Sequence, residues 1–369
     1  MEQAKVYFTD FRTTLEENLL QKLARLMATA GMDRINFEGK YVAIKMHFGE
    51  PGNLAFLRPN YARAVVDFIK DLGGRPFLTD CNTLYVGGRK NALDHLDSAN
   101  LNGFTPLTTG CQILIADGLK GTDEVRVPIP GGEYLQEAIL GRALVDADIV
   151  ISLTHFKGHE NTAFGGALKN LGMGGGSRAG KMAMHAAGKP FVSQELCVGC
   201  GSCARICAHG APVEENGVMR IDRDRCVGCG RCLGVCPMDA ICSPNDESFK
   251  LLSAKIAEYA KAVLSGKPHF HISLANAISP NCDCHSENDV PIVPDIGMFA
   301  SYDPVAIDQA CIDAVNAQPR LQNTWINDYG DPSIQDNLIA SHPTTNWRDQ
   351  IDHAVKIGLG TDQYELIRI

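Results

Sequence analysis

The chain has 369 residues, 45% of them hydrophobic, so it has enough apolar material for two or more folded units. A formal net charge of −9 argues against a nucleic-acid-binding surface, which needs an excess of lysine and arginine. The fourteen cysteines are accompanied by neither a signal peptide nor a long apolar run. We therefore expect a cytoplasmic protein with reduced thiols that binds neither nucleic acid nor membrane.

The N-terminal part of the chain alternates apolar strands with amphipathic helices. Strands are expected at 6–8, 41–46, 76–80 and 149–153, and helices near 15–27 and 61–72. Repeated β–α–β units predict an α/β fold with a mainly parallel sheet flanked by helices. Such a sheet binds ligands beyond the carboxyl ends of its strands.

Polar side chains with catalytic potential follow three of the predicted strands. A single polar residue after a strand is ordinarily part of a turn, but several at one sheet edge indicate a shared pocket. The residues at these strand ends are His47, Glu50, Asp80, His155, Lys157 and His159. Because histidine and lysine can supply protons to a substrate, we expect the catalytic residues to be His47, Glu50, Asp80, His159 and Lys169.

The glycine-rich segment 174–182 has a partial resemblance to a phosphate-binding loop. Lys181 has the position of the loop lysine, but Met182 stands where a Ser or Thr would bind magnesium, and no strand precedes the segment. Nucleotide hydrolysis is therefore not expected. A flexible loop whose Arg178 and Lys181 lie over an anionic ligand is the alternative.

The cysteines between residues 197 and 237 form two sets with the same spacing. Each set has three cysteines at two-residue intervals, which suit three corners of a cubane cluster, and a fourth that belongs to the cluster of the other set. The sequence therefore predicts two [4Fe–4S] clusters. One would be held by Cys197, Cys200, Cys203 and Cys236, and the other by Cys226, Cys229, Cys232 and Cys207.

Residues 191–243 resemble bacterial-type two-cluster ferredoxin domains through this spacing. Structural zinc is the alternative, since paired cysteines also make zinc sites, but two runs of four match the cluster pattern at every position. Ala208 follows Cys207 where Pro237 follows Cys236, which leaves the ligands themselves unchanged.

The α/β pattern resumes after the cysteines. An amphipathic helix is expected at 249–264 and a strand at 268–274. The simplest organisation is a discontinuous α/β body formed by 1–190 and 245–369, with an α+β ferredoxin-like domain of two [4Fe–4S] clusters inserted at 191–244.

A second cysteine motif occurs at Asn281-Cys282-Asp283-Cys284-His285. Two thiolates separated by one residue can bind a single soft metal ion, and a neighbouring histidine adds a donor. We expect Cys282 and Cys284 to bind one additional metal ion or to act as a redox pair. The alternative is a turn with two incidental cysteines, although packing cysteines prefer apolar surroundings.

Several segments resemble the family of uncharacterised iron–sulfur-centre proteins known as domain of unknown function 362. The matching segments are 43–50, 78–85, 155–159, 165–174 and 281–284. The resemblance implies the inserted architecture and the two clusters, but it implies no particular reaction.

These patterns predict an iron–sulfur redox protein that passes single electrons to a pocket in the α/β body. The expected activity is that of an oxidoreductase, with a redox partner protein or a small-molecule substrate. A non-enzymatic electron carrier, and a metal or cofactor maturation protein using the Cys282–Cys284 loop, are the alternatives. No G-x-G-x-x-G follows a strand, so the sequence gives no sign of a flavin or nicotinamide site.

Overall fold

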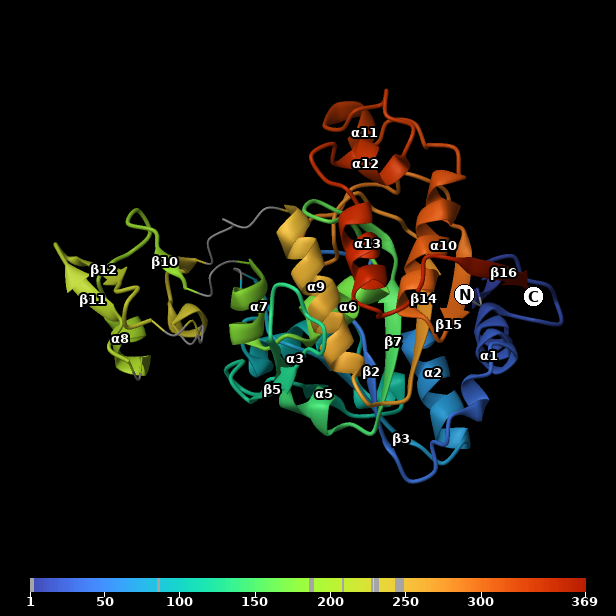
Figure 1. Cartoon of the computed structure of the whole chain (residues 1–369), viewed down its shortest axis with the longest axis horizontal. Coiled ribbons are helices and arrows are strands. Elements are labelled where there is room, and N and C mark those ends of the chain that lie inside the picture. The colour runs from blue at the N-terminus through green and yellow to red at the C-terminus, as the bar shows by residue number, and fades with distance from the viewer. Residues whose placement is uncertain are drawn as a thin grey trace.

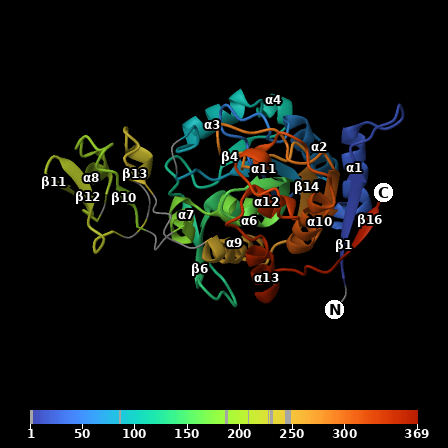
Figure 2. The ribbon, with the colours of Figure 1, turned by 90° about the horizontal axis from the view of Figure 1, so that it is seen from above.

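The computed structural model describes residues 3–84, 87–185, 189–207, 209–226, 228, 232–242 and 249–369. Figure 1 shows a large α/β body and a smaller lobe, on the left of the view, formed by the described residues between 189 and 242. Figure 2 shows the same separation from above, with α7 (Arg178–His185) as the part of the body nearest to the lobe.

The body is organised around a mixed sheet, which within the described part of the chain has eight strands in the order β16-β1-β15-β14-β7-β2-β3-β4. Neighbours from β14 to β4 are parallel, whereas β15 is antiparallel to both β14 and β1. The sheet is therefore mainly parallel, as the sequence predicted. The strands are β1 (Ala4–Asp10), β2 (Tyr41–Lys45), β3 (Arg75–Asp80), β4 (Ile113–Ile115), β7 (Ile149–His155), β14 (His269–Ala275), β15 (Gly297–Ser301) and β16 (Tyr364–Arg368).

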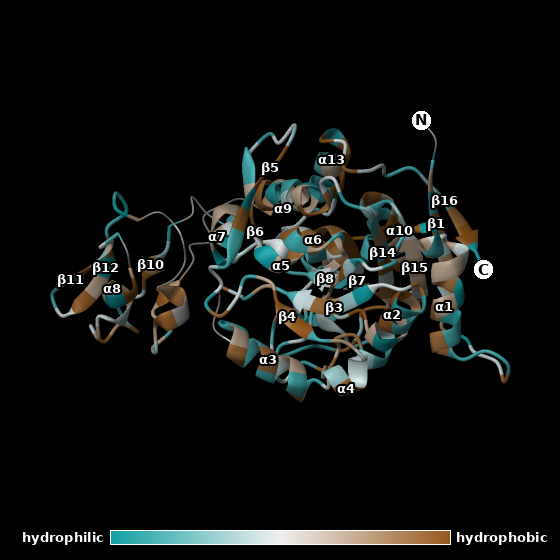
Figure 3. Cartoon of the chain, turned by 90° about the horizontal axis from the view of Figure 1, so that it is seen from below, coloured by the Kyte–Doolittle hydropathy of each residue, from teal (hydrophilic) through white to brown (hydrophobic). Residues whose placement is uncertain are grey.

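Helices cover both faces of the sheet, which lies between them in Figure 3. One face packs on α1 (Leu19–Thr29), α2 (Pro59–Asp71) and α3 (Ala92–Leu101). The other packs on α6 (Ala167–Gly175), α9 (Phe249–Leu264), α10 (Pro304–Asn316) and α13 (Arg348–Lys356). Because both faces are covered, the central strands are continuous apolar runs rather than alternating ones.

Shorter elements connect these layers. The hairpins are β5 (Glu124–Pro128) with β6 (Glu137–Gly141), and β8 (Lys157–His159) with β9 (Ala163–Gly165). The remaining α-helices of the body are α4 (Pro106–Thr109), α5 (Arg142–Asp146), α11 (Trp325–Asp328) and α12 (Asn337–Ser341). No helix in the described ranges is long and apolar enough to cross a membrane.

The segment 174–182 is helical for most of its length, so the expectation of a flexible loop is wrong. Its first residues end α6, and α7 begins at Arg178. The Arg178 and Lys181 side chains are buried. Arg178 donates to the carbonyls of Lys90 and Lys120, which ties α7 to the loops after β3 and β4.

Gly172 sets the distance between α6 and α9. A Cβ at this position would lie 2.1 Å from the carbonyl oxygen of Ile256, and that oxygen belongs to helix backbone that cannot move aside. We expect Gly172→Ala to lower the free energy of unfolding by about 1–3 kcal/mol, because the clash outweighs the better helix propensity of alanine. Urea unfolding followed by circular dichroism measures this, and an unchanged midpoint would contradict the close packing.

The smaller lobe contains two antiparallel strand pairs and a short helix. β10 (Phe191–Val192) pairs with β13 (Ile241–Cys242), and β11 (Pro212–Glu215) pairs with β12 (Val218–Ile221). The helix is α8 (Ser202–Ile206). The β10–β13 pair brings the first and last described strands of the lobe side by side.

Candidate functional site

A cavity lies at the carboxyl edge of the parallel strands. Its empty space, open solvent included, is about 610 Å³. Parallel strands end at the same edge, so residues from the ends of β2, β3 and β7 meet there. Of the residues expected to be catalytic, His47, Asp80 and Lys169 line the cavity, together with Cys282 and Cys284.

Glu50 is not among the cavity-lining residues and instead supports one of them. Its Oε2 accepts a hydrogen bond of 2.6 Å from Nε of Arg89, a buried arginine that lines the cavity. Arg89 also places Nη1 2.7 Å from Nε2 of His47. Burial and the charge of Arg89 lower the pKa of His47 well below its usual value, so this imidazole is neutral and can accept a hydrogen bond.

A buried ion pair forms one wall of the cavity. Nζ of Lys45 lies 2.9 Å from Oδ1 of Asp80, and both side chains are at most 4% exposed. Nζ also donates to Oδ1 of Asn170 at 2.9 Å. Burial by itself would raise the pKa of Asp80, but the charge of Lys45 and of other neighbouring groups lowers it. The carboxylate is thus ionised in the folded protein.

We expect Asp80→Ala to destabilise the body by about 3–5 kcal/mol at neutral pH, because it leaves the Lys45 charge buried without its partner. The folded-state pKa of Asp80 is depressed, so its contribution is present above the unfolded pKa of about 4 and is lost as the pH falls below it. The variant should therefore lose less stability than wild type on acidification. Urea unfolding at pH 7 and in acid measures both effects.

Asp67→Ala is the matched control for this prediction. It breaks the Arg63–Asp67 pair, in which both side chains are nearly half exposed. A surface pair of this kind contributes at most about 1 kcal/mol. If Asp80→Ala lowers the free energy of unfolding no more than Asp67→Ala does, the buried Lys45–Asp80 pair does not stabilise the body as proposed.

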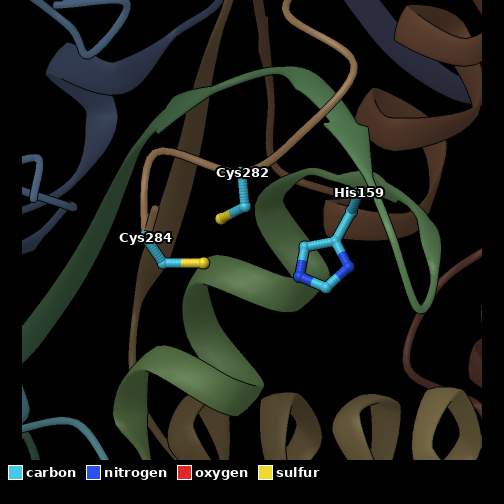
Figure 4. A group of neighbouring side chains, drawn as sticks. All are labelled: His159, Cys282 and Cys284. Carbon is cyan, nitrogen blue, oxygen red and sulfur yellow. The ribbon is translucent and has the colours of Figure 1, made fainter. Parts of the chain in front are cut away.

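Cys282, Cys284 and His159 lie around a common space beside the cavity (Figure 4). One donor atom from each lies within 4.8 Å of the other two. Cys282 is buried, and Nζ of Lys169 lies 3.1 Å from its sulfur. Two residues that were expected to be catalytic, His159 and Lys169, therefore lie next to the predicted cysteine pair.

The pKa values of the two cysteines are shifted in opposite directions. The hydrogen bond from Cys284, followed by the charges of Lys169 and Lys157, lowers the pKa of Cys282 well below its usual value. The same hydrogen bond, with burial, raises the pKa of Cys284 well above its usual value. The pair thus holds a thiolate at Cys282 and a thiol at Cys284.

Asp283 fixes the turn that carries the two cysteines. Its carboxylate oxygens both lie 2.9 Å from Nδ1 of His155, and one lies 3.3 Å from Nζ of Lys157. Burial by itself would raise the pKa of Asp283, but the charges of these two residues lower it. His155 and Lys157, expected at the pocket from their position after a strand, line the cavity and hold this turn.

A second group of possible metal ligands adjoins the first. Glu160, Cys284 and His285 also bring one donor atom each within 4.8 Å of one another. Nε2 of His285 lies 3.0 Å from Oε1 of Glu160. The described residues therefore contain nitrogen, sulfur and oxygen donors compatible with a metal ion, and metal binding by Cys282 and Cys284 stays a prediction.

In the smaller lobe, Cys197, Cys200, Cys203 and Cys236 line one hollow, whose empty space, open solvent included, is about 300 Å³. These are the four cysteines predicted to share a cluster. Backbone amides point at two of the sulfurs, since Met219 donates to Cys197 at 3.2 Å and Ala240 donates to Cys236 at 3.3 Å. The donor set and its amides fit an iron–sulfur cluster, whose thiolates accept such hydrogen bonds.

The second predicted ligand set is only partly visible. Cys207, Cys226 and Cys232 pack, partly buried, against the small hydrophobic cluster of the lobe. Cys229 lies outside the described residues. The second cluster therefore stays a prediction.

The lobe contacts the body next to the cavity. Leu84 and Met182 belong to the body but pack within the hydrophobic cluster of the lobe. Met182 follows Lys181, which lines the cavity. Lys90 forms an ion pair with Asp239 of the lobe. The lobe therefore contacts the part of the body that contributes Lys181 to the cavity.

Three cavity residues, Lys45, Arg89 and Lys181, were not predicted to take part in a site around the strand ends. The sequence could have indicated Lys45, because a charged residue within an otherwise apolar strand needs a buried partner. Lys181 belongs to the glycine-rich segment 174–182, whose pattern predicted a loop. No sequence pattern indicates Arg89, because its partners His47 and Glu50 are about forty residues away in the sequence.

Comparison with known proteins gives the family of the chain. Residues 42–313 match the family described as Domain of unknown function (DUF362), and the chain belongs to it. A thylakoid-associated protein from Synechocystis sp. is 26% identical over 164 residues, which are 42% of this chain and 45% of that protein.

Two solved structures have partial similarity. The lactate racemase apoprotein from Thermoanaerobacterium thermosaccharolyticum has a TM-score of 0.34 at 13% identity, over 74% of this chain and 50% of that one. A Thermotoga maritima protein has a TM-score of 0.38 at 13% identity, over 82% of this chain and 59% of that one. The chain thus spans about half the length of these relatives, and TM-scores this low carry no information about function.

Proposed function

We propose that this member of the DUF362 family is an iron–sulfur redox protein that passes single electrons from two [4Fe–4S] clusters in its smaller lobe to the cavity of the α/β body. The observation that carries the proposal is the convergence of Cys197, Cys200, Cys203 and Cys236 on one hollow. Their spacing in the sequence and their meeting in the fold both fit one cubane cluster.

Residues 191–244 are accordingly an inserted ferredoxin-like domain in this proposal. Cys226, Cys229, Cys232 and Cys207 would hold the second cluster. When bound, such clusters accept and release one electron each. The strand pairs β10–β13 and β11–β12 support a small, self-contained fold around both ligand sets. The contacts of Leu84, Met182 and Lys90 support a docking of that domain on the body near the cavity.

The cavity favours an oxidoreductase over a simple electron carrier. A carrier needs only an exposed approach to its clusters, whereas this cavity has buried charged groups aimed into it. Lys45, Asp80 and Lys157 are each at most 6% exposed. Keeping such charges away from water is costly, which is typical of sites that bind and orient a small molecule. The electrons themselves would come from a redox partner protein.

A maturation protein for a metal or cofactor is the second candidate function. It is favoured by the donor atoms of His159, Cys282 and Cys284, which lie within 4.8 Å of one another. An ion held there in transit would exchange readily with a small chelator. An ion that resists chelation, or no ion at all, would leave the oxidoreductase as the better account.

A reductive titration under anaerobic conditions tests the proposed function. We expect the two clusters to take up about one electron each, with low-temperature electron paramagnetic resonance signals of two interacting cubane clusters. Cys311→Ser should leave this uptake and these signals unchanged, because Cys311 is a buried cysteine outside both ligand sets and is not a lining residue of the cavity. A colourless protein that takes up no electrons and contains zinc would contradict the proposal.

A further inference from the structure

Cys282 and Cys284 lie in one tight turn. The amide of His285 donates to the carbonyl of Cys282 at 3.1 Å, which closes a β-turn with the two cysteines at its first and third positions. Such a turn brings the two Cα atoms to about 5–6 Å, within the range of disulfides. The carboxylate of Asp283, held by His155 and Lys157, keeps the turn in this form.

Three donors surround the sulfur of Cys282. They are Nζ of Lys169 at 3.1 Å, the thiol of Cys284, and the ring of His159. These contacts stabilise a thiolate in a buried position. They come from α6, from the turn itself and from β8, so the arrangement depends on the folded body and not on the turn alone.

The hydrogen bonds of His159 favour a donor over a metal ligand. The amide of Asn161 donates to Nδ1 of His159 at 3.0 Å, so the ring proton lies on Nε2. Nε2 lies 3.5 Å from the carboxylate of Glu160. A protonated Nε2 can donate to the Cys282 thiolate or to Glu160, but it cannot bind a metal ion without a change of tautomer.

We propose that Cys282 and Cys284 are a redox-active dithiol that interconverts with a disulfide and forms the two-electron acceptor of the cavity. The inference rests on the proposed function for its source of electrons, one from each of the two iron–sulfur centres. Reduction breaks the Sγ–Sγ bond, two electrons enter, and one proton binds Cys284, which leaves Cys282 as the thiolate. Oxidation by a small two-electron acceptor in the cavity reverses these changes.

The position of the pair suits this role. Both cysteines line the cavity, so a substrate there can reach them. Lys169 and Lys157 carry positive charge toward the sulfurs. The neighbouring titratable groups include His47, His159, Glu160, Asp283 and His285. The positive charges favour the thiolate that reduction produces, and a thiolate is the form that attacks a substrate or re-forms the disulfide.

The redox state of the two sulfurs can be measured directly. Anaerobically purified protein is equilibrated in glutathione redox buffers, alkylated, digested and analysed by mass spectrometry. We expect both thiols to become protected together as the buffer becomes more oxidising, with the peptide losing the mass of two hydrogens. Cys284→Ser should lose this joint protection. Cys311→Ser, which replaces a buried cysteine of α10, is the matched control and should retain it.

A second arm separates this inference from the proposed function. Oxidised protein is treated with dithiothreitol or with reduced methyl viologen, in wild type and in Cys203→Ser/Cys207→Ser, which is expected to lose both clusters. We expect dithiothreitol to restore the thiols in both, and methyl viologen to restore them in wild type alone. If methyl viologen reduces the disulfide equally in wild type and in the variant, the redox-active dithiol is supported, but its reduction through the iron–sulfur clusters is contradicted. The absence of a disulfide in every buffer, with one metal ion per chain that Cys282→Ser loses, would overturn the dithiol.

Discussion

Cys203→Ser is expected to remove about four of the eight cluster irons of the protein, and Cys236→Ser is expected to remove the same four. Both residues line the same hollow of the lobe, although they belong to different cysteine sets in the sequence. Combining the two substitutions should therefore cost no more iron than either alone. Combining Cys203→Ser with Cys207→Ser, two neighbours in one set, should remove all eight, because they serve different clusters. Anaerobic iron and sulfide analysis measures these losses.

Cys242→Ser is the matched control, since Cys242 is a free, partly buried cysteine of the same lobe outside both ligand sets. It should retain the full iron content. The interleaved assignment would be contradicted if Cys203→Ser with Cys207→Ser lost only half of the iron, because each set would then hold its own metal site. Zinc in place of iron in wild type would contradict the clusters altogether.

Lys169→Met is expected to slow the alkylation of Cys282 at pH 6 by roughly tenfold or more, because a hydrogen bond to a charged group contributes about 1.5–3 kcal/mol. The charge of Lys169 helps to lower the pKa of Cys282, so removing it raises that pKa. In wild type the thiolate persists at acidic pH, where an ordinary thiol, with a pKa of about 8.5, is protonated. In the variant the rate should fall as the pH decreases through the raised pKa.

Lys261→Met is the control for this prediction. Lys261 is also a partly buried lysine, but it donates to the carbonyl of Ile357, away from the cavity. The pH profile of alkylation should be unchanged in it. If Lys169→Met also leaves the profile unchanged, the lysine does not stabilise the thiolate, and the dithiol loses its main electrostatic support.

The sheet core could be predicted from the sequence because buried parallel strands are short apolar runs. The segments expected at 41–46, 76–80 and 149–153 correspond to β2, β3 and β7, and the helix expected at 249–264 corresponds to α9. The strands at the β1 edge of the sheet were not predictable in the same way. β1 pairs with β15 and β16, which lie roughly 300 or more residues later in the sequence, and no local pattern specifies such a partner.

The candidate site was predictable where chemistry is tied to a strand end or to cysteine spacing. His47, Asp80, Lys169, Cys282 and Cys284 meet at the cavity because the topology brings strand ends to one edge. Glu50 shows the limit of that rule. It follows a strand as expected, but its carboxylate faces Arg89, and whether a polar residue lines a cavity or holds another that does depends on packing between distant segments.

The most direct test of the central claim is an anaerobic metal and sulfide analysis of wild type beside Cys282→Ser/Cys284→Ser. Two cubane clusters in the smaller lobe predict about eight iron and eight sulfide per chain in both proteins. With a dithiol in the cavity, no further metal should distinguish them. Wild type with substantially less iron and sulfide, or with zinc in their place, would contradict the account.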